Sequence, residues 1–227
     1  MTVYLLQQGD WMRKEKMAVT MPDLPHLLCT YENLFSIPKD DYIPVGTVEY
    51  TTKYAELNDI KLPENITYPS TLDYYLKRLI YQDTFKNVQS NLFVKPLTTK
   101  TFTGDIKSKL TEYVNPDETV WVSETINLIN EYRYYIIDHT IAGYSRYDST
   151  DNEDIIPDPN VIQSMITDYT DQPIGYCIDV GIIDKNETVL VEVNDGWSLG
   201  LYPWGNMTRE KYVELITRRW KEIISTI

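Results

Sequence analysis

Residues 175–196 read GYCIDVGIIDKNETVLVEVNDG, which indicates two strands joined by a polar turn at 184–187. A two-residue or a four-residue loop would close this turn, and both loop lengths give the same register of the two strands. In that register Asp179 lies directly opposite Glu192. Because side chains alternate along a strand, Asn194 shares the face of Glu192. The sequence therefore predicts a β-hairpin that carries two carboxylates and one amide on one face.

Two acids that face each other need an explanation, because like charges directly opposite one another destabilise a sheet. A slipped register would not separate them, since it would turn the apolar residues of the other face outward. Two carboxylates and an amide oxygen are hard ligands suited to Mg²⁺, which commonly takes phosphate oxygens as further ligands. We therefore expect Asp179, Glu192 and Asn194 to hold Mg²⁺, and the alternative is a solvated acidic face. The apolar residues of the other face are Ile178, Val180, Val191 and Val193.

A basic segment upstream supplies groups that bind phosphate. Residues 95–109, KPLTTKTFTGDIKSK, contain four lysines and one acid in a chain whose net charge is −13. Lys95 ends an apolar strand at 91–96, and a threonine-rich loop follows; backbone amides and lysines in such a loop can hold a polyphosphate. We expect Lys95 and Lys107 to bind a nucleotide, with Lys100 and Lys109 in the same segment. A surface hairpin with solvated lysines is the alternative.

The segment between these two regions adds two acids and an arginine. Glu124 and Glu131 are seven residues apart, and Arg133 shares a strand face with Glu131. A carboxylate at a sheet edge can accept hydrogen bonds from ribose hydroxyls, and arginine can form paired hydrogen bonds with phosphate or carboxylate. Arg146, in GYSRY, is a second candidate. Each of these residues would be an ordinary surface charge if it stood alone.

The rest of the chain mixes helix and strand signals, which predicts an α+β fold. A helix with apolar residues at helical spacing is expected after Pro69. Asp158 and Pro159 are typical of a helix start, as the N-cap and the first helical residue. The last helix begins near Thr208 and presents one apolar stripe to the core. Further strands are expected at 2–7, 42–50, 119–128, 131–138 and 144–147.

This order of residues resembles that of ATP-grasp enzymes. The pattern runs from the strand lysine of FVKP, through a loop and two glutamates, to an Asp, a Glu and an Asn. The spacing of the last three, in GYCIDVGIIDKNETVLVEVN, is similar to that of D-alanine–D-alanine-ligase-like members. The chain further resembles the small phage and bacterial branch that is named for two arginines and a lysine. Lys95, Arg133 and Arg146 would be that trio, and DGWSLGLYPWG at 195–205 resembles the C-terminal signature of the branch.

The resemblance implies an ATP-grasp fold of two α+β lobes that grip a nucleotide, preceded by a short N-terminal α/β segment. We expect residues 1–66 to form the N-terminal domain, 67–120 the small lobe, and 121–227 the large lobe with the metal site. The implied activity is that of an ATP- and Mg²⁺-dependent ligase. It would activate a carboxylate as an acyl phosphate and join it to an amine, and both substrates would be small molecules or peptides.

The same resemblance implies which residues bind the nucleotide. Lys95 would contact the α- and β-phosphates of ATP. Glu124 would lie at the adenine hinge, and Glu131 would bind the ribose. Lys77 and Arg78 are the candidates for a further base that the family places upstream of Lys95.

It also implies the residues at the reacting end of the nucleotide. Asp179, Glu192 and Asn194 would hold one or two Mg²⁺ ions. Arg133 and Arg146 would steady the transferring phosphoryl group or an anionic substrate. No serine or cysteine nucleophile is needed for this chemistry.

The composition limits other classes of function. The chain has 227 residues, of which 34 are acidic and 21 basic, and this balance disfavours a protein that coats nucleic acid. No apolar run approaches the ~20 residues that a membrane span needs. We expect a cytoplasmic monomer or homodimer with no nucleic-acid or membrane partner. The alternatives are a metal-dependent nuclease that uses Asp179 and Glu192, and a non-catalytic interaction module rich in aromatic residues.

Overall fold

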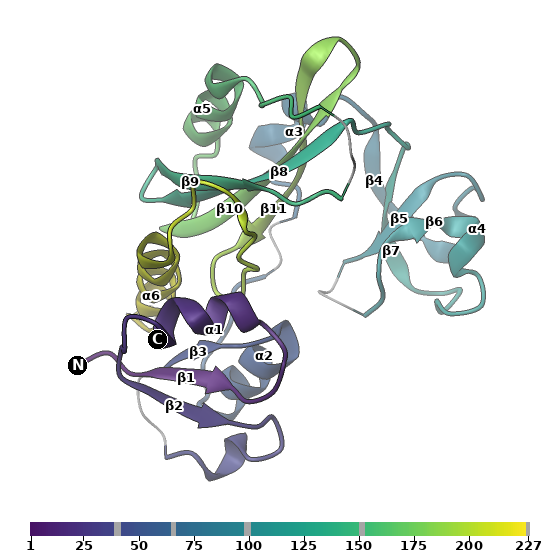
Figure 1. The fold of residues 1–227 in the computed structure, drawn as a ribbon. Helices are drawn as coiled ribbons and strands as arrows, with labels where there is room; N and C mark the ends of the chain where they lie inside the picture. Colours follow the sequence, from purple (N-terminus) through teal and green to yellow (C-terminus); the bar gives the residue numbers. More distant parts are fainter. Residues whose placement is uncertain (39–41, 65–66, 98–100, 150–152, 226–227) are drawn as a thin grey trace.

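The computed structural model describes residues 1–38, 42–64, 67–97, 101–149 and 153–225. The strands in this part of the chain form three sheets, of three, five and four strands. The N-terminal sheet lies below the five-stranded sheet in Figure 1, and the four-stranded sheet stands to one side of both. Among the described residues, no helix is long and apolar enough to cross a membrane.

The N-terminal sheet is parallel, with the strand order β2-β1-β3. The strand expected at 42–50 is only three residues long, because Thr47 ends it and caps the following helix. The Thr47 hydroxyl accepts a hydrogen bond from the Tyr50 amide at 3.3 Å. The elements of this unit are β1 (Tyr4–Gln7), α1 (Arg13–Thr20), β2 (His26–Cys29), β3 (Ile43–Val45) and α2 (Val48–Leu57).

The four-stranded sheet is antiparallel, with the order β4-β7-β5-β6. Its small core is made of valines and Phe85. The strand expected at 119–128 ends at Ser123, and this strand belongs to the four-stranded sheet, so the sheet extends beyond the boundary expected at 120. The elements are β4 (Ile80–Thr84), β5 (Phe93–Pro96), β6 (Asp105–Ile106), α4 (Lys107–Leu110) and β7 (Thr119–Ser123).

The helix after Pro69 is much shorter than the apolar spacing indicates. A 3₁₀ turn at Ser70–Leu72 leads into α3 (Asp73–Leu76), and Lys77 then adopts a φ of 52°, which ends the helix. The chain turns into β4 directly afterwards. The buried residues of this short helical segment pack into the core of the five-stranded sheet, not of the four-stranded one. Residues 67–76 were expected in the small lobe, but in the structure they pack with the five-stranded sheet.

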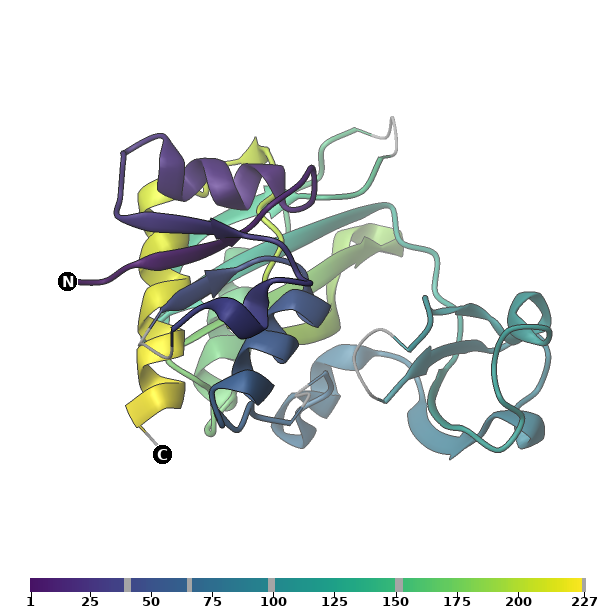
Figure 2. The ribbon, with the colours of Figure 1, turned by 90° about the horizontal axis from the view of Figure 1, so that it is seen from below.

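The five-stranded sheet has the order β11-β10-β8-β9-β12. Helix α5 covers one face, and α6 with the N-terminal unit covers part of the other face (Figures 1 and 2). The N-cap predicted at Asp158 is confirmed, because its side chain accepts a hydrogen bond from the Asn160 amide at 2.8 Å. The elements are β8 (Asn130–Ile137), β9 (Thr140–Arg146), α5 (Pro159–Asp168), β10 (Gly175–Ile183), β11 (Glu187–Asp195), β12 (Trp204–Gly205) and α6 (Arg209–Ser225).

Side-chain alternation gives this sheet two different faces. One face is mostly apolar and packs on α5. The other face is apolar near α6, where Tyr135 and Cys177 are buried. Two residues further along each strand, Arg133 and Asp179 take their place on the same face. Polar side chains therefore gather at the end of the sheet that lies away from α6.

In the hairpin of β10 and β11, the pair that places the two acids opposite each other is as predicted, but the loop that joins the strands is not. Its loop spans three residues, Asp184–Asn186, so the expected loops of two or four residues were wrong. A three-residue loop sets a register that is one residue away from the predicted pairing. The extra residue Val191 then forms a β-bulge, after which Asp179 pairs with Glu192 as predicted. Val191 is half-buried and is not part of the apolar face on which it was expected.

Candidate functional site

Arg133 and Asp179 form a buried ion pair on the polar face of the five-stranded sheet. Arg133 donates from Nε to Oδ1 of Asp179 at 2.8 Å and from Nη2 to Oδ2 at 2.7 Å. Asp179 is 1% exposed and Arg133 is 9% exposed. Burial alone would lower the pKa of Arg133, but the Asp179 carboxylate together with Cys177 and Tyr202 outweighs burial and raises that pKa well above its ordinary value. Two of the three guanidinium nitrogens are therefore committed to Asp179.

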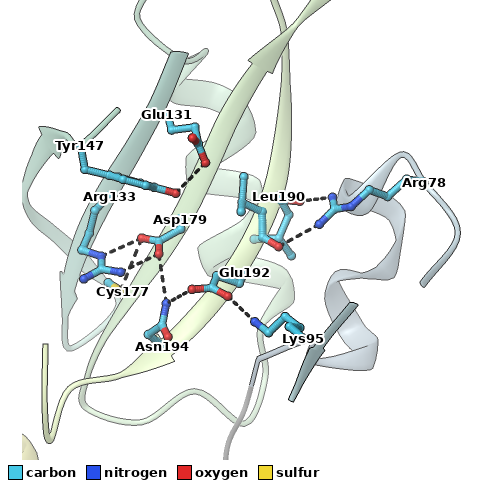
Figure 3. A network of polar contacts seen from close by, with 11 residues as sticks. Arg78, Lys95, Glu131, Arg133, Tyr147, Cys177, Asp179, Leu190, Glu192 and Asn194 are labelled. Atoms are coloured by element: carbon cyan, nitrogen blue, oxygen red, sulfur yellow. Dashed lines mark hydrogen bonds and ion pairs between the residues drawn. The ribbon is translucent and has the colours of Figure 1, made fainter. Parts of the chain in front are cut away.

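A single amide group separates the two carboxylates of the hairpin. Nδ2 of Asn194 donates to Oδ2 of Asp179 at 3.0 Å and to Oε1 of Glu192 at 2.8 Å. Figure 3 shows this amide between the two acids. The positive end of the amide dipole thus lies where two carboxylate oxygens from neighbouring strands converge. Hydrogen bonding by Asn194 offsets part of the repulsion that opposed acids impose on a sheet.

Lys95 reaches the same group from the four-stranded sheet. Its ammonium donates to Oε2 of Glu192 and forms an ion pair with it, and the side chains are 15% and 26% exposed respectively. The ring centre of Tyr68 lies 5.0 Å from Nζ of Lys95. Burial opposes the ionisation of Glu192, but Lys95, Asn194 and Arg133 together outweigh burial and lower the pKa of Glu192 below its ordinary value. The site is therefore built from two different sheets, which meet where Lys95 contacts Glu192.

Arg78 joins this network from the junction of α3 and β4. It donates from Nη1 to the Leu190 carbonyl at 2.7 Å and from Nη2 to the Val191 carbonyl at 3.0 Å (Figure 3). Its Nε donates to Oγ of Ser123, at the end of β7, at 2.9 Å. Lys77, the other candidate, extends toward the hairpin loop, where its Nζ lies 3.9 Å from a carboxylate oxygen. Of the two candidate bases, Arg78 is the one that contacts the hairpin beside Glu192.

Glu131 and two tyrosines surround the other side of Arg133. The Tyr147 hydroxyl donates to Oε1 of Glu131 at 3.0 Å. The rings of Tyr147 and Tyr202 stack with their centres 5.3 Å apart, and the guanidinium carbon of Arg133 lies 5.9 and 5.2 Å from the two ring centres. Burial raises the pKa of Glu131, and the hydrogen bond from Tyr147 opposes this rise. Sequence reasoning missed both tyrosines, since nothing distinguishes them among the 19 tyrosines of the chain.

Glu124 lies where the chain passes from the four-stranded to the five-stranded sheet. Its amide donates to the Leu79 carbonyl at 3.1 Å, and the Leu79 amide donates to its carboxylate at 2.8 Å. The chain then crosses the polar face, where Leu128 packs over Gly181. A Cβ at Gly181 would overlap the Leu128 side chain, so glycine lets this crossing segment lie close to β10. Glu124 is thus placed at the junction of the two sheets.

Lys107 does not face the site, in contrast to the sequence-based expectation. Its ammonium donates to the carbonyls of Lys86 and Val88, within the unit of the four-stranded sheet. It also lies over the ring of Phe85, 5.4 Å from the centre. The lysine therefore secures a turn of its own unit. Lys100, expected in the same basic segment, lies outside the described residues.

Arg146 is also separated from the network. It pairs with Tyr132 across β8 and β9, whereas Arg133 pairs with Ser145, so alternation places the two arginines on opposite faces of the sheet. The Arg146 guanidinium donates twice to the Asp148 carboxylate, at 2.9 Å in both cases. The two arginines were expected to act together at the reacting group, but the structure does not bring them together.

The residues present fit a small, hard cation. Among the described residues, no group of three or more His, Cys, Asp or Glu side chains is arranged to hold a metal, so a site here would consist of two carboxylates and one amide. The two carboxylate oxygens that accept from Nδ2 of Asn194 converge on one point. Rotating that amide by half a turn would present its oxygen to the same point. Three hard oxygen donors suit Mg²⁺, which retains water for its other positions.

The three sheets and this arrangement of residues define an α+β protein with the ATP-grasp fold. Within that class, the chain belongs to a family of ATP-grasp domains, the second family of the clade named for two arginines and a lysine. The model of this family matches residues 75–214, more than half of the chain. ATP binding is supported at the level of this family. No curated protein matches the sequence.

Solved structures with the same fold cover nearly the whole chain at low identity. A D-alanine–D-alanine ligase from Bacillus anthracis has 12% identity over 100% of this chain and 99% of that chain, with a TM-score of 0.63. A RimK domain ATP-grasp protein from Sphaerobacter thermophilus has 13% identity over 97% of both chains and a TM-score of 0.54. The ATP-grasp ligase PsnB, complexed with a minimal precursor, has 10% identity over 96% of this chain and 99% of that chain, with a TM-score of 0.50.

Proposed function

We propose that this protein is an ATP- and Mg²⁺-dependent ligase, which activates a carboxylate as an acyl phosphate and joins it to an amine. The observation that carries the proposal is the meeting of Lys95, from the four-stranded sheet, with Glu192 beside Asp179 and Asn194 on the five-stranded sheet. A cation and a set of hard oxygen ligands thus face each other from two sheets. This is the arrangement that a magnesium triphosphate needs.

The metal would be held by Asp179, Glu192 and Asn194. Arg133 holds the Asp179 carboxylate in one orientation by its two hydrogen bonds. Such support of a ligand by a neighbouring group typically changes metal affinity about 10–100-fold when it is lost. When bound, Mg²⁺ would neutralise charge on the phosphates and on the phosphoryl group in transfer. Arg133 acts here mainly through Asp179, since the edge of its guanidinium formed by Nε and Nη2 is already paired with that carboxylate.

Lys95 is the proposed phosphate-binding base. In the structure its ammonium is paired with Glu192, so phosphate oxygens would replace the carboxylate as its partner. Glu131 and Glu124 are the proposed acceptors for the ribose and for the adenine side of the nucleotide. Both lie along the path from the sheet junction to Arg133. Position and charge, with no covalent intermediate on the protein, would carry the phosphoryl transfer.

The proposed substrates are a carboxylate and an amine, each carried by a small molecule or a peptide. The structural neighbours support this range: one is named as a D-alanine–D-alanine ligase, and another is complexed with a minimal precursor. In the reaction, the carboxylate oxygen would attack the γ-phosphorus and release ADP. The amine would then attack the acyl carbon and release phosphate. The proton lost from the amine would leave to solvent or to a neighbouring base.

The test is ATP-dependent amide formation by the purified chain. Pools of carboxylates and amines would be incubated with ATP and Mg²⁺, ADP release would be followed, and amide products would be identified by mass spectrometry. Lys95→Ala and Glu192→Gln should each lower ADP release at least about 100-fold, the size expected for losing one electrostatic contact to the transferring group. Lys86→Ala is the matched control, because Lys86 is exposed and pairs with Asp117 at the surface of the same unit. Wild-type ADP release in both site variants would refute the proposal.

A further inference from the structure

The β-bulge at Val191 decides which face of the sheet Glu192 occupies. In the register that the loop sets, Val180 pairs with Leu190, and the next pair would be Asp179 with Val191. Glu192 would then point into the apolar core beneath α5, because side chains alternate along a strand. The extra residue shifts Glu192 onto the face of Asp179. With this sequence and this loop, the three proposed metal ligands come together only because of the bulge.

A bulge leaves backbone groups without partners in the ladder, and Arg78 supplies partners for two of them. Nη1 donates to the Leu190 carbonyl and Nη2 to the Val191 carbonyl, the two residues that precede Glu192. Nη1 also donates to the Leu76 carbonyl at 3.0 Å, and Nε donates to Ser123. The guanidinium therefore joins the bulge to the end of α3 and to the end of β7.

These contacts use most of the donor capacity of the side chain. A guanidinium has five N–H groups. Four of them donate to Leu76, Leu190, Val191 and Ser123. One N–H group, on Nη2, is left for another acceptor, so the side chain cannot form the paired hydrogen bonds by which arginine binds phosphate while it holds these four partners. Lysine could not replace this pattern, because all three N–H groups of its ammonium lie on one atom and cannot reach the four separate partners of the guanidinium at once.

We propose that Arg78 is a positioning residue, which holds the β-bulge at Val191 and thereby keeps Glu192 opposite Asp179, and that it is not a phosphate-binding base. The consequence for turnover rests on the function proposed above. The consequence for the register of the hairpin does not, because it concerns only contacts within the protein itself.

Deletion of Val191 distinguishes a role of Arg78 in holding the bulge from a role in binding phosphate. The deletion joins Leu190 directly to Glu192, so the pairs Val180–Leu190 and Asp179–Glu192 become consecutive in an unbroken ladder. The hairpin then has no bulge to hold, and Arg78 becomes dispensable for the register. We would compare Arg78→Gln, the Val191 deletion, the two changes combined, and Arg78→Lys, all in the full chain. Arg218→Gln is the control for losing an arginine, since Arg218 is exposed on α6.

Two measurements are made on each variant: cross-strand backbone NOEs from residue 179, and ADP release with ATP and Mg²⁺. In Arg78→Gln and Arg78→Lys, the NOE from 179 to 192 should be lost and turnover should fall about 10–100-fold. In the deletion background, the equivalent NOE should remain, and adding Arg78→Gln should change turnover by no more than about twofold, as for independent sites. Arg218→Gln should leave both readouts unchanged.

Three results would overturn the inference. The first is an unchanged 179–192 NOE in Arg78→Gln. The second is full turnover in Arg78→Lys, which would identify a phosphate-binding cation. The third is an equal loss of turnover when Arg78→Gln is made with and without Val191. If the wild-type chain turns over no nucleotide, the proposed function fails, and the NOEs in Arg78→Gln, Arg78→Lys and the deletion still decide whether Arg78 holds the bulge. If the deletion variant does not fold, the NOEs of Arg78→Gln and Arg78→Lys still decide whether Arg78 holds the bulge.

Discussion

The two opposed acids of the hairpin are balanced by bases from different elements. Arg133 of β8 pairs with Asp179, Lys95 of β5 pairs with Glu192, and Asn194 donates to both acids. The sequence-based argument that a cation is required was therefore incomplete, because two protein cations already face the acids. Bound Mg²⁺ would instead compete with Asn194 for the oxygens between the strands. These contacts balance the charge of the two acids and keep the proposed metal ligands side by side.

At this scale we predict that Lys95→Met raises the pKa of Glu192. In the native protein burial acts to raise that pKa, and Lys95, Asn194 and Arg133 together outweigh burial, with Lys95 the largest of the three. Without the ammonium, burial acts on the carboxylate with less opposition and favours its protonated form. The measurement is a pH titration of the Glu192 side-chain carbon by ¹³C NMR in both proteins. An unchanged titration midpoint would show that the ion pair is absent in solution.

The same pair predicts a pH dependence of stability. Because the pKa of Glu192 is lower in the folded than in the unfolded chain, its contribution to the free energy of unfolding is present above the ordinary glutamate pKa of about 4.3. It is lost as the pH falls through the folded value. In Lys95→Met this contribution is missing, so the difference in unfolding free energy between the two proteins should have its full size at pH 7 and shrink as the pH falls below about 4.3. Urea denaturation at several pH values measures it, and a constant difference would contradict the assignment.

At the scale of elements, the sequence predicts best where one periodic pattern runs over many residues. Helices α5 and α6 and the β10–β11 hairpin follow from their apolar stripes and from the Asp158 cap. Helix α1 escaped prediction because its first four residues, RKEK, are all charged. The helix after Pro69 was overextended because a positive φ at Lys77 has no signal in its apolar spacing. The register of the hairpin could not be predicted from the sequence alone. The sequence did not determine the length of the loop, and the bulge at Val191 offsets the shift that this length causes.

The predicted site residues also fall into two groups, according to whether a strand pattern or only local charge supported the prediction. Lys95, Arg133, Asp179, Glu192 and Asn194 lie together because strand alternation already placed most of them on shared faces. Lys107 and Arg146 were misplaced because local charge says nothing about which side of a sheet or which neighbour a residue meets. Arg78 was singled out only as one of two bases, since its bulge carbonyls are invisible in the sequence.

The N-cap of α5 gives a prediction for an element. Asp158→Ala removes the acceptor for the Asn160 amide and should lower the free energy of unfolding by about 1 kcal/mol. Asp171→Ala is the matched control, because Asp171 is exposed just beyond the other end of the helix. It should change stability by no more than about 0.5 kcal/mol. Equal effects of the two substitutions in denaturant titrations would show that the cap does not stabilise α5.

At the scale of the whole molecule, the site depends on how two sheets meet. Lys95 contacts Glu192, Arg78 spans β7 and β11, and the Glu124–Leu79 hydrogen bonds lie at the junction between the two units. A nucleotide held by both sheets would add further contacts between them. Binding should therefore stabilise the folded chain as a whole.

We predict that a nonhydrolysable ATP analogue raises the melting temperature only when Mg²⁺ is present. At a concentration about 100-fold above Kd, the gain of about 2.7 kcal/mol corresponds to a rise of roughly 5–10 °C for a chain of this size. A nuclease would instead nick DNA with metal and without ATP, and a non-catalytic interaction module would show neither response. Nicking without any nucleotide-dependent shift would favour the nuclease.

The most direct measurement is isothermal titration calorimetry of the nonhydrolysable ATP analogue, with and without Mg²⁺, on the wild-type chain and on Glu192→Gln. We predict tight, Mg²⁺-dependent binding by the wild type. Glu192→Gln should reduce the Mg²⁺-dependent part of the affinity about 10–100-fold, the usual cost of weakening a metal's ligand shell. Binding that is equally strong in both proteins, or independent of Mg²⁺ in the wild type, would contradict the claim that Lys95, Asp179, Glu192 and Asn194 form a magnesium-nucleotide site.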